Sequence, residues 1–181
     1  MSTTASPATD LRYPIGRLQR TPSLTTEQRT ASIRAIAELP TKLRAAVEGL
    51  SDHQLDTPYR PDGWTVRQLV HHVADSHMHA FARTRYALAE RDVTITPYDE
   101  SAWAELADMR KMSVQPSLAL LDGLHARWAY LLEAIPVEDY ARTIQHPANG
   151  RMTVDDIIGV YDWHGRHHTR HVTALRERMG W

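Results

Sequence analysis

The sequence predicts an all-α protein, a four-helix bundle with one or two long crossover connections. Four long segments place apolar residues three and four positions apart, which is the period of an amphipathic α-helix. Helix-capping and turn residues punctuate these segments, and no run with strand periodicity is long enough to support a sheet. With 181 residues, 42% of them hydrophobic, the chain can bury one sizeable core.

The first two helices are expected over residues 26–48 and 65–89. In the first, the apolar period continues across Pro40, which indicates a kink rather than a break between two elements. The second opens at Thr65-Val66-Arg67-Gln68, a capping box in which the Thr hydroxyl and the Gln amide satisfy free N–H groups of the first turn.

The third helix is expected to begin near Pro116 and the fourth at Thr153. Proline is favoured at the first helical position, and Asp156 follows Thr153 at the spacing of a capping pair. The long connection over residues 91–115 contains a predicted short helix through Trp103 and Leu106. The segment 146–151 contains Asn-Gly and is predicted to be a turn.

Composition narrows the domain organisation and the function. Residues 1–12 resemble a flexible tail, and residues 13–181 form one predicted domain. The 21 basic and 22 acidic residues show no basic run, so we expect no nucleic-acid partner. No stretch of about 18 apolar residues occurs, so we expect no membrane partner and a soluble, cytoplasmic protein. The absence of cysteine excludes disulfides, thiolate ligands and a cysteine nucleophile.

Four histidines lie within eight residues of the predicted fourth helix, in Trp163-His164-Gly165-Arg166-His167-His168-Thr169-Arg170-His171. Histidines four residues apart on a helix point the same way, so their imidazoles can converge on one divalent cation. This spacing fits His164 with His168, and also His167 with His171. The cluster therefore predicts a metal site, with two alternative pairs.

Helical periodicity selects between these pairs. At about 100° per residue, His168 lies within roughly 20° of the centre of the apolar stripe and His164 roughly 60° from it. His171 and His167 lie roughly 80° and 120° away on the same scale, so both are expected to point outward. The inward pair is therefore His164 with His168.

A third ligand is expected from the second helix, because a catalytic metal site needs three protein ligands and an open position. The segment Val70-His71-His72-Val73-Ala74-Asp75-Ser76-His77-Met78-His79 offers several histidines. Local periodicity leaves His71, His72 and His77 as comparable candidates, whereas His79 is expected to point outward.

Several motifs together resemble the YfiT group of the DinB-like superfamily, over nearly the whole chain after the tail. They are Tyr13-Pro14-Ile15-Gly16, Leu55-Asp56-Thr57-Pro58-Tyr59-Arg60, Gly63-Trp64-Thr65-Val66-Arg67-Gln68, His71-His72-Val73-Ala74-Asp75-Ser76-His77-Met78, Pro97-Tyr98-Asp99-Glu100, Trp163-His164 and Arg178-Met179-Gly180-Trp181.

The resemblance implies one divalent metal per chain, zinc or nickel, bound by three histidines in a homodimer. By position in the motifs, the implied ligands are His72, His164 and His168. Family members are metal-dependent hydrolases or bacillithiol-type thiol S-transferases, so a small-molecule thiol, an electrophilic substrate or both are the implied partners. We expect thiol transfer by a metal-activated thiolate, with hydrolysis by metal-activated water as the first alternative and non-catalytic metal or ligand binding as the second.

Other metal motifs are absent. Gly165 follows His164, so there is no HExxH motif with its built-in Glu base. A di-iron bundle needs Glu-x-x-His pairs, and the sequence offers only Asp122-x-x-His125, which is expected to be a solvated pair on a helix face.

The roles of residues around the site are less determined by the sequence. Asp75 is expected either to accept a hydrogen bond from a ligand imidazole or to pair with a surface arginine. Arg166 and Arg170 flank the ligands and are expected to be solvated, with binding of a substrate carboxylate as the alternative, and no general base stands out. The motif Tyr98-Asp99-Glu100 is a candidate lining of the site mouth, and four tryptophans are expected to anchor the core: Trp64, Trp103, Trp128 and Trp163.

Overall fold

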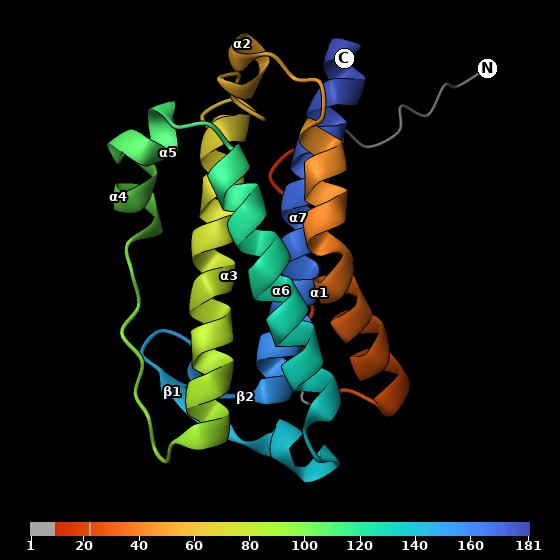
Figure 1. Cartoon of the computed structure of the whole chain (residues 1–181), viewed down its shortest axis with the longest axis vertical. Helices are drawn as coiled ribbons and strands as arrows, with labels where there is room; N and C mark the ends of the chain where they lie inside the picture. The colour runs from red at the N-terminus through yellow and green to blue at the C-terminus, as the bar shows by residue number, and fades with distance from the viewer. Residues whose placement is uncertain (1–9, 22) are drawn as a thin grey trace, which may run out of the picture.

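The computed structural model describes residues 10–21 and 23–181, and four long helices dominate it (Figure 1). They are α1 (Thr26–Val47), α3 (Val66–Ala89), α6 (Gln115–Ala134) and α7 (Val154–Met179). Short helices are α2 (Asp52–Leu55), α4 (Glu100–Ala104), α5 (Ala107–Lys111) and the 3₁₀ helix η1 (Val137–Ala141). The predicted four-helix bundle is confirmed.

The helices do not simply alternate in direction. α1 and α7 run one way along the bundle, whereas α3 and α6 both run the other way (Figure 1). The connection between α3 and α6 therefore returns along the length of the bundle, as the predicted crossover requires, and it carries α4 and α5. α1 and α3 each pack against both α6 and α7.

The predicted helix starts are confirmed, and two of them have the predicted side-chain caps. Thr65 and Gln68 form a capping box at the start of α3, and Thr153 and Asp156 form one at the start of α7. α1 continues through Pro40, as predicted, and α6 begins one residue before Pro116. The predicted short helix around Trp103 and Leu106 is in fact two, since Leu106 is the N-cap of α5.

The prediction that the chain forms no sheet is wrong at one place. Strands β1 (Thr143–His146) and β2 (Gly150–Thr153) pair antiparallel around the predicted Asn-Gly turn. Gly150 has φ 72°, which a glycine adopts without strain. Four-residue strands are too short to show a period in the sequence, and this hairpin is stabilised by burying Ile144 and Met152 in the core.

The core consists of two hydrophobic clusters stacked along the bundle axis. The cluster near the hairpin contains Ile36 of α1 and Tyr161 of α7, and the other begins at Leu39 and Val172 of the same helices. Between them, α3, α6 and α7 contribute histidines to a layer that crosses the bundle, and all of these are buried except the half-buried His164. Members of this histidine layer are His72, His77, His125, His164 and His168.

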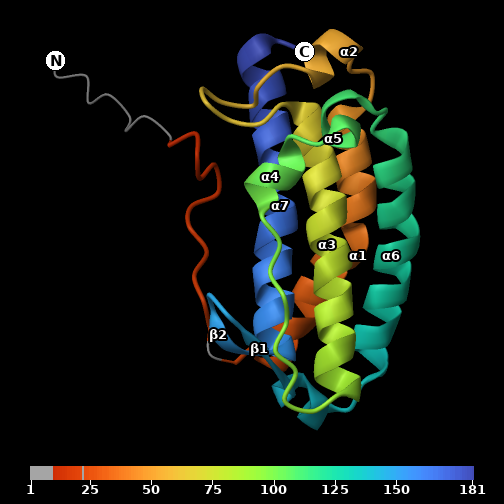
Figure 2. The ribbon, with the colours of Figure 1, turned by 90° about the vertical axis from the view of Figure 1, so that its left-hand side faces the viewer.

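The segment before α1 lies along α7 and ends beside the hairpin (Figure 2). Trp163 donates a hydrogen bond from Nε1 to the Gly16 carbonyl at 3.3 Å, and Arg20 donates one to Asn149 Oδ1 at 2.8 Å. Of the predicted tail 1–12, residues 1–9 lie outside the described residues, and Asp10 begins a turn that ends at Tyr13. Within the described ranges, every helix is too short or too polar to cross a bilayer.

Candidate metal centre

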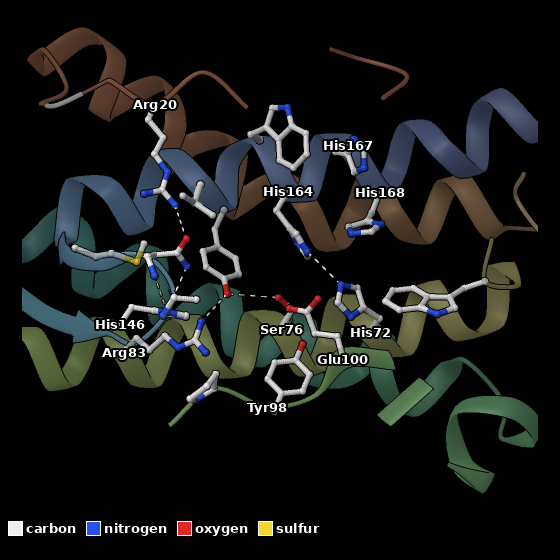
Figure 3. A pocket seen from close by; sticks show the side chains of 18 residues that line it. Arg20, His72, Ser76, Arg83, Tyr98, Glu100, His146, His164, His167 and His168 are labelled. Carbon is white, nitrogen blue, oxygen red and sulfur yellow. Dashed lines mark hydrogen bonds between the residues drawn. The ribbon is translucent and has the colours of Figure 1, made fainter. Parts of the chain in front are cut away.

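Three histidines from two antiparallel helices converge in the histidine layer (Figure 3). Each of His72, His164 and His168 offers one ring nitrogen, and these three atoms lie within 4.8 Å of one another. His164 and His168 are one turn apart on α7, and His72 faces them from α3. The Nε2 atoms of His72 and His164 are 3.3 Å apart. The structure thus brings together the three residues implied by the resemblance.

These imidazoles suit a divalent metal because all three are neutral and one of them is incompletely hydrogen-bonded. Burial lowers the pKa of His72 to about 4, and burial together with neighbouring histidines lowers the pKa values of His164 and His168 well below the usual value. Metal coordination requires the neutral ring. His168 Nδ1 is buried and has no hydrogen-bond partner among the described residues. Three nitrogen donors fit zinc or nickel, and none of the three is a hard oxygen ligand.

A fourth histidine fixes the orientation of His164. His77 is fully buried, and its Nε2 lies 3.1 Å from Nδ1 of His164. If His164 coordinates through Nε2, its proton lies on Nδ1, and His77 Nε2 is then the acceptor. Ligand histidines generally donate this second N–H to a carboxylate, a carbonyl or a water. A neutral imidazole in that place is a departure from the general pattern.

The chain of buried rings continues to α6 and α1. The ring of His125 stacks on that of His77 at 4.9 Å, and its Nδ1 donates to the Ile36 carbonyl at 2.6 Å. That carbonyl is free because Pro40, four residues on, has no N–H to offer it. The expectation of a solvated Asp122–His125 pair is therefore wrong: Asp122 pairs with Arg44, whereas His125 is fully buried.

Of the alternatives on the second helix, His71 points away from the centre. Its Nδ1 lies 2.7 Å from Ser117 Oγ and its Nε2 lies 3.2 Å from the Met112 carbonyl, so both ring nitrogens are engaged elsewhere. Asp75 fulfils neither expected role, because within the described ranges it forms no hydrogen bond or ion pair. Burial and the nearby charge of Asp108 raise the pKa of Asp75 to about 6.

The expectation that His167 and His171 point outward is wrong. Both are buried, and their Nε2 atoms are 3.0 Å apart. Tyr59 covers His171 at 4.2 Å between ring centroids, while Trp163 stacks on His167 at 4.3 Å. Helical periodicity missed this because the covering Tyr59 comes from a loop far away in sequence.

The three-histidine centre opens into a cavity of about 510 Å³. Trp64 and Trp163 are half-buried and line it. Trp64 also packs against the hydrophobic cluster around Leu39 and Val172 and lies 4.7 Å from the His72 ring, whereas the expectation that Trp163 anchors the core is wrong. Trp128 is fully buried in the core, as expected, and Trp103 contacts Tyr98 at 4.6 Å.

The crossover segment supplies further walls of this cavity. Tyr98 and Glu100 line it, as the resemblance suggested, but Asp99 caps α4 instead by accepting a hydrogen bond from the Ala102 N–H. Glu100 is the one carboxylate among the described lining residues, and burial raises its pKa. It was not foreseen as an acid–base group, because only the folded crossover brings it beside the histidines.

The two arginines next to the ligands in sequence lie outside the cavity. Arg166 pairs with Asp162 at 2.6 Å, and Arg170 pairs with Glu177 at 2.5 Å. The expectation that they are solvated helix residues agrees with these pairs, because such exposed ion pairs contribute little to stability.

Comparisons with known proteins agree with this architecture. A family model of the DinB superfamily matches residues 35–172. Relatives from Bacillus cereus strain B4264 and Bacillus anthracis strain CDC 684 are 49% identical over 172 residues, covering 95% of this chain and 99% of theirs. Both are named "Putative metal-dependent hydrolase".

A solved structure shows the same fold. YfiT from Bacillus subtilis superimposes with a TM-score of 0.91 at 46% identity, covering 94% of this chain and 98% of its own. It is described as "a probable metal-dependent hydrolase with an unusual four-helix bundle topology". The two parallel pairs, α1 with α7 and α3 with α6, and the long α3–α6 crossover fit that description (Figure 1). From these matches and from the helix order, the chain belongs to the DinB superfamily and shares the four-helix bundle of YfiT.

Proposed function

We propose that this chain is a metal-dependent enzyme that transfers a low-molecular-weight thiol to an electrophilic substrate. The observation that carries the proposal is the position of three neutral imidazoles, His72, His164 and His168, at the wall of a cavity large enough for two small reactants. A divalent ion held there would lower the pKa of a bound thiol or water so that either is a nucleophile at neutral pH.

The protein's own residues prepare the site for this chemistry. His72, His164 and His168 would hold zinc or nickel. His77 engages Nδ1 of His164, which keeps the Nε2 lone pair of His164 directed toward the other two ligand rings. The indole rings of Trp64 and Trp163 give the cavity an apolar wall that excludes water from a thiolate and suits an apolar electrophile. The new C–S bond would form as the leaving group departs from the electrophilic carbon.

Neutral ligands also favour a thiolate. Three imidazoles leave the full charge of a divalent ion available, and within the described ranges no carboxylate hydrogen-bonds to the ligand rings. A thiol whose pKa a bound divalent ion lowers would release its proton to solvent and would need no separate base. A non-catalytic binding bundle is disfavoured because the cavity beside the histidines leaves room for a substrate.

Hydrolysis is a second candidate, and Glu100 is the specific observation in its favour. Its carboxyl group lines the same cavity, and burial raises its pKa, as suits a general acid–base group. The names of the relatives also point to hydrolysis. The homodimer implied by the resemblance and the cytoplasmic location expected from the sequence remain predictions.

A pair of assays separates the two candidates. Zinc- or nickel-loaded protein is incubated with monochlorobimane and each of bacillithiol, mycothiol, glutathione and cysteine, and separately with ester and amide substrates. Thiol transfer predicts metal-dependent conjugation that Glu100→Gln largely retains. If no thiol is accelerated while esters or amides turn over, and Glu100→Gln abolishes that turnover, the hydrolase replaces the transferase.

A further inference from the structure

The end of the cavity away from the three histidines is positively charged (Figure 3). Arg20, Arg83, His146 and Asn149 line this end, which we call the arginine end. They arrive from three separate parts of the chain: the segment before α1, helix α3 and the β1–β2 hairpin. Neither arginine lies within salt-bridge distance of a carboxylate in residues 10–21 and 23–181.

Hydrogen bonds hold this end in place. Arg20 donates from Nη2 to Asn149 Oδ1 at 2.8 Å, and Arg83 donates from Nη1 to the Tyr161 hydroxyl at 3.4 Å. His146 Nδ1 accepts the Ala148 and Asn149 N–H groups at 3.2 and 3.3 Å, so its proton lies on Nε2. The guanidinium groups and this N–H are all donors, as an anion site requires.

The charge on the cavity wall indicates which anion fits. Arg20 and Arg83 bring two guanidinium groups to this end, whereas Glu100, the one carboxylate among the described lining residues, lies beside His72 (Figure 3). Burial lowers the pKa of His146, and the charges of Arg83 and Arg20 lower it further, so His146 adds a donor but no charge. A carboxylate is a planar acceptor that matches the fork of guanidinium N–H donors at this end.

We propose that Arg20 and Arg83 bind a carboxylate of the substrate whose reacting atom lies at the three histidines. This rests on the proposed function, because it names the class of substrate for the same site: a thiol or electrophile that carries a carboxylate several bonds from its reacting atom. Arg83 is half-buried beside Tyr161 and holds the anion, while Arg20 closes over it from the more exposed side.

The test compares glutathione with its diethyl ester, which masks both carboxylates and keeps the thiol. Cobalt-loaded protein reports binding through the thiolate-to-cobalt absorption band, which does not depend on turnover. Glutathione should bind about tenfold or more tightly than the ester, as expected for charge-assisted hydrogen bonds. This preference should collapse in Arg83→Met and weaken in Arg20→Met. Arg85→Met, an exposed arginine on the same helix that does not line the cavity, should keep it.

A thiol-free arm separates this proposal from the proposed function. S-methylglutathione and its diethyl ester are titrated against the tryptophan fluorescence of the same protein, since Trp64 and Trp163 line the cavity. If free thiols leave the cobalt spectrum unchanged while S-methylglutathione still binds more tightly than its ester, thiol transfer fails and the carboxylate site stands. If neither acid is preferred over its ester, or if Arg83→Met keeps the preference, the carboxylate proposal is overturned.

Discussion

Replacing His77 with phenylalanine tests whether the imidazole that contacts His164 Nδ1 strengthens metal binding. Phenylalanine keeps the ring that stacks on His125 at 4.9 Å and meets Tyr161 at 5.0 Å, but it removes the acceptor 3.1 Å from His164 Nδ1. With a metal on Nε2, the proton of His164 must lie on Nδ1, where it would have no partner. Losing such a partner weakens metal binding about 10- to 100-fold, which is about 1.4–2.8 kcal/mol.

The loss should fall on the metal-bound state rather than on folding. Without metal, His164 can carry its proton on Nε2 and donate it toward His72 Nε2 at 3.3 Å, so no donor is stranded. His77→Phe should therefore change the unfolding free energy of the metal-free protein by less than the about 1–3 kcal/mol of an unsatisfied buried donor. Zinc affinity is measured by competition with a chromophoric chelator, and unfolding by urea titration.

His125→Phe is the matched control, because His125 is equally buried in the same stack. It removes the donor to the Ile36 carbonyl and leaves the His77–His164 contact in place. It should destabilise the fold while leaving zinc affinity nearly unchanged. The reasoning is refuted if His77→Phe binds zinc as tightly as the unchanged chain, or if His125→Phe weakens zinc binding to the same extent.

Three further outcomes follow. His168→Ala should abolish metal binding, whereas His171→Ala should leave the affinity for metal within a few fold. Both are measured as metal content of protein made without an affinity tag. The reverse order would mean that His171 is the ligand. The pKa values of His72 and His125 are lowered to about 4, so the unfolded chain takes up protons first as the pH falls. The metal-free protein should be most stable above about pH 6.5. Between that pH and pH 4, its free energy of unfolding in urea should fall by up to about 1.4 kcal/mol per histidine per pH unit. A free energy of unfolding that does not change over this range would contradict the prediction. Pro40→Ala should raise the free energy of unfolding by much less than the about 3 kcal/mol that helix propensity alone predicts. The reason is that the restored N–H competes with His125 for the Ile36 carbonyl. The same urea titration measures the change.

The four long helices and their caps could be predicted because their signals are local. Thr65 with Gln68, and Thr153 with Asp156, act within one turn, and apolar periodicity is a property of a single helix. Periodicity likewise selected His164 with His168. It could not choose between His71 and His72, because that depends on Ser117 of α6 and the Met112 carbonyl of the crossover, which only the folded chain brings to His71.

Errors arose wherever distant segments cover a helix face. His171 has a polar position on the helical wheel, yet Tyr59 buries it. His125 resembles a surface residue, yet it fills the gap that Pro40 leaves in α1. The arginine end and an acid–base role for Glu100 were not predicted, because no local pattern marks residues that distant segments of the chain bring to one cavity.

The histidine layer has a consequence for how the helices align. An entirely apolar bundle tolerates sliding of one helix past another by a turn, since one leucine replaces another in contact. Here such a slip would carry His77 or His125 into a hydrocarbon layer without a partner, and each stranded polar group costs about 1–3 kcal/mol. The free Ile36 carbonyl marks the matching level on α1. A single polar level shared by all four helices therefore specifies their axial register and rejects misaligned packings during folding.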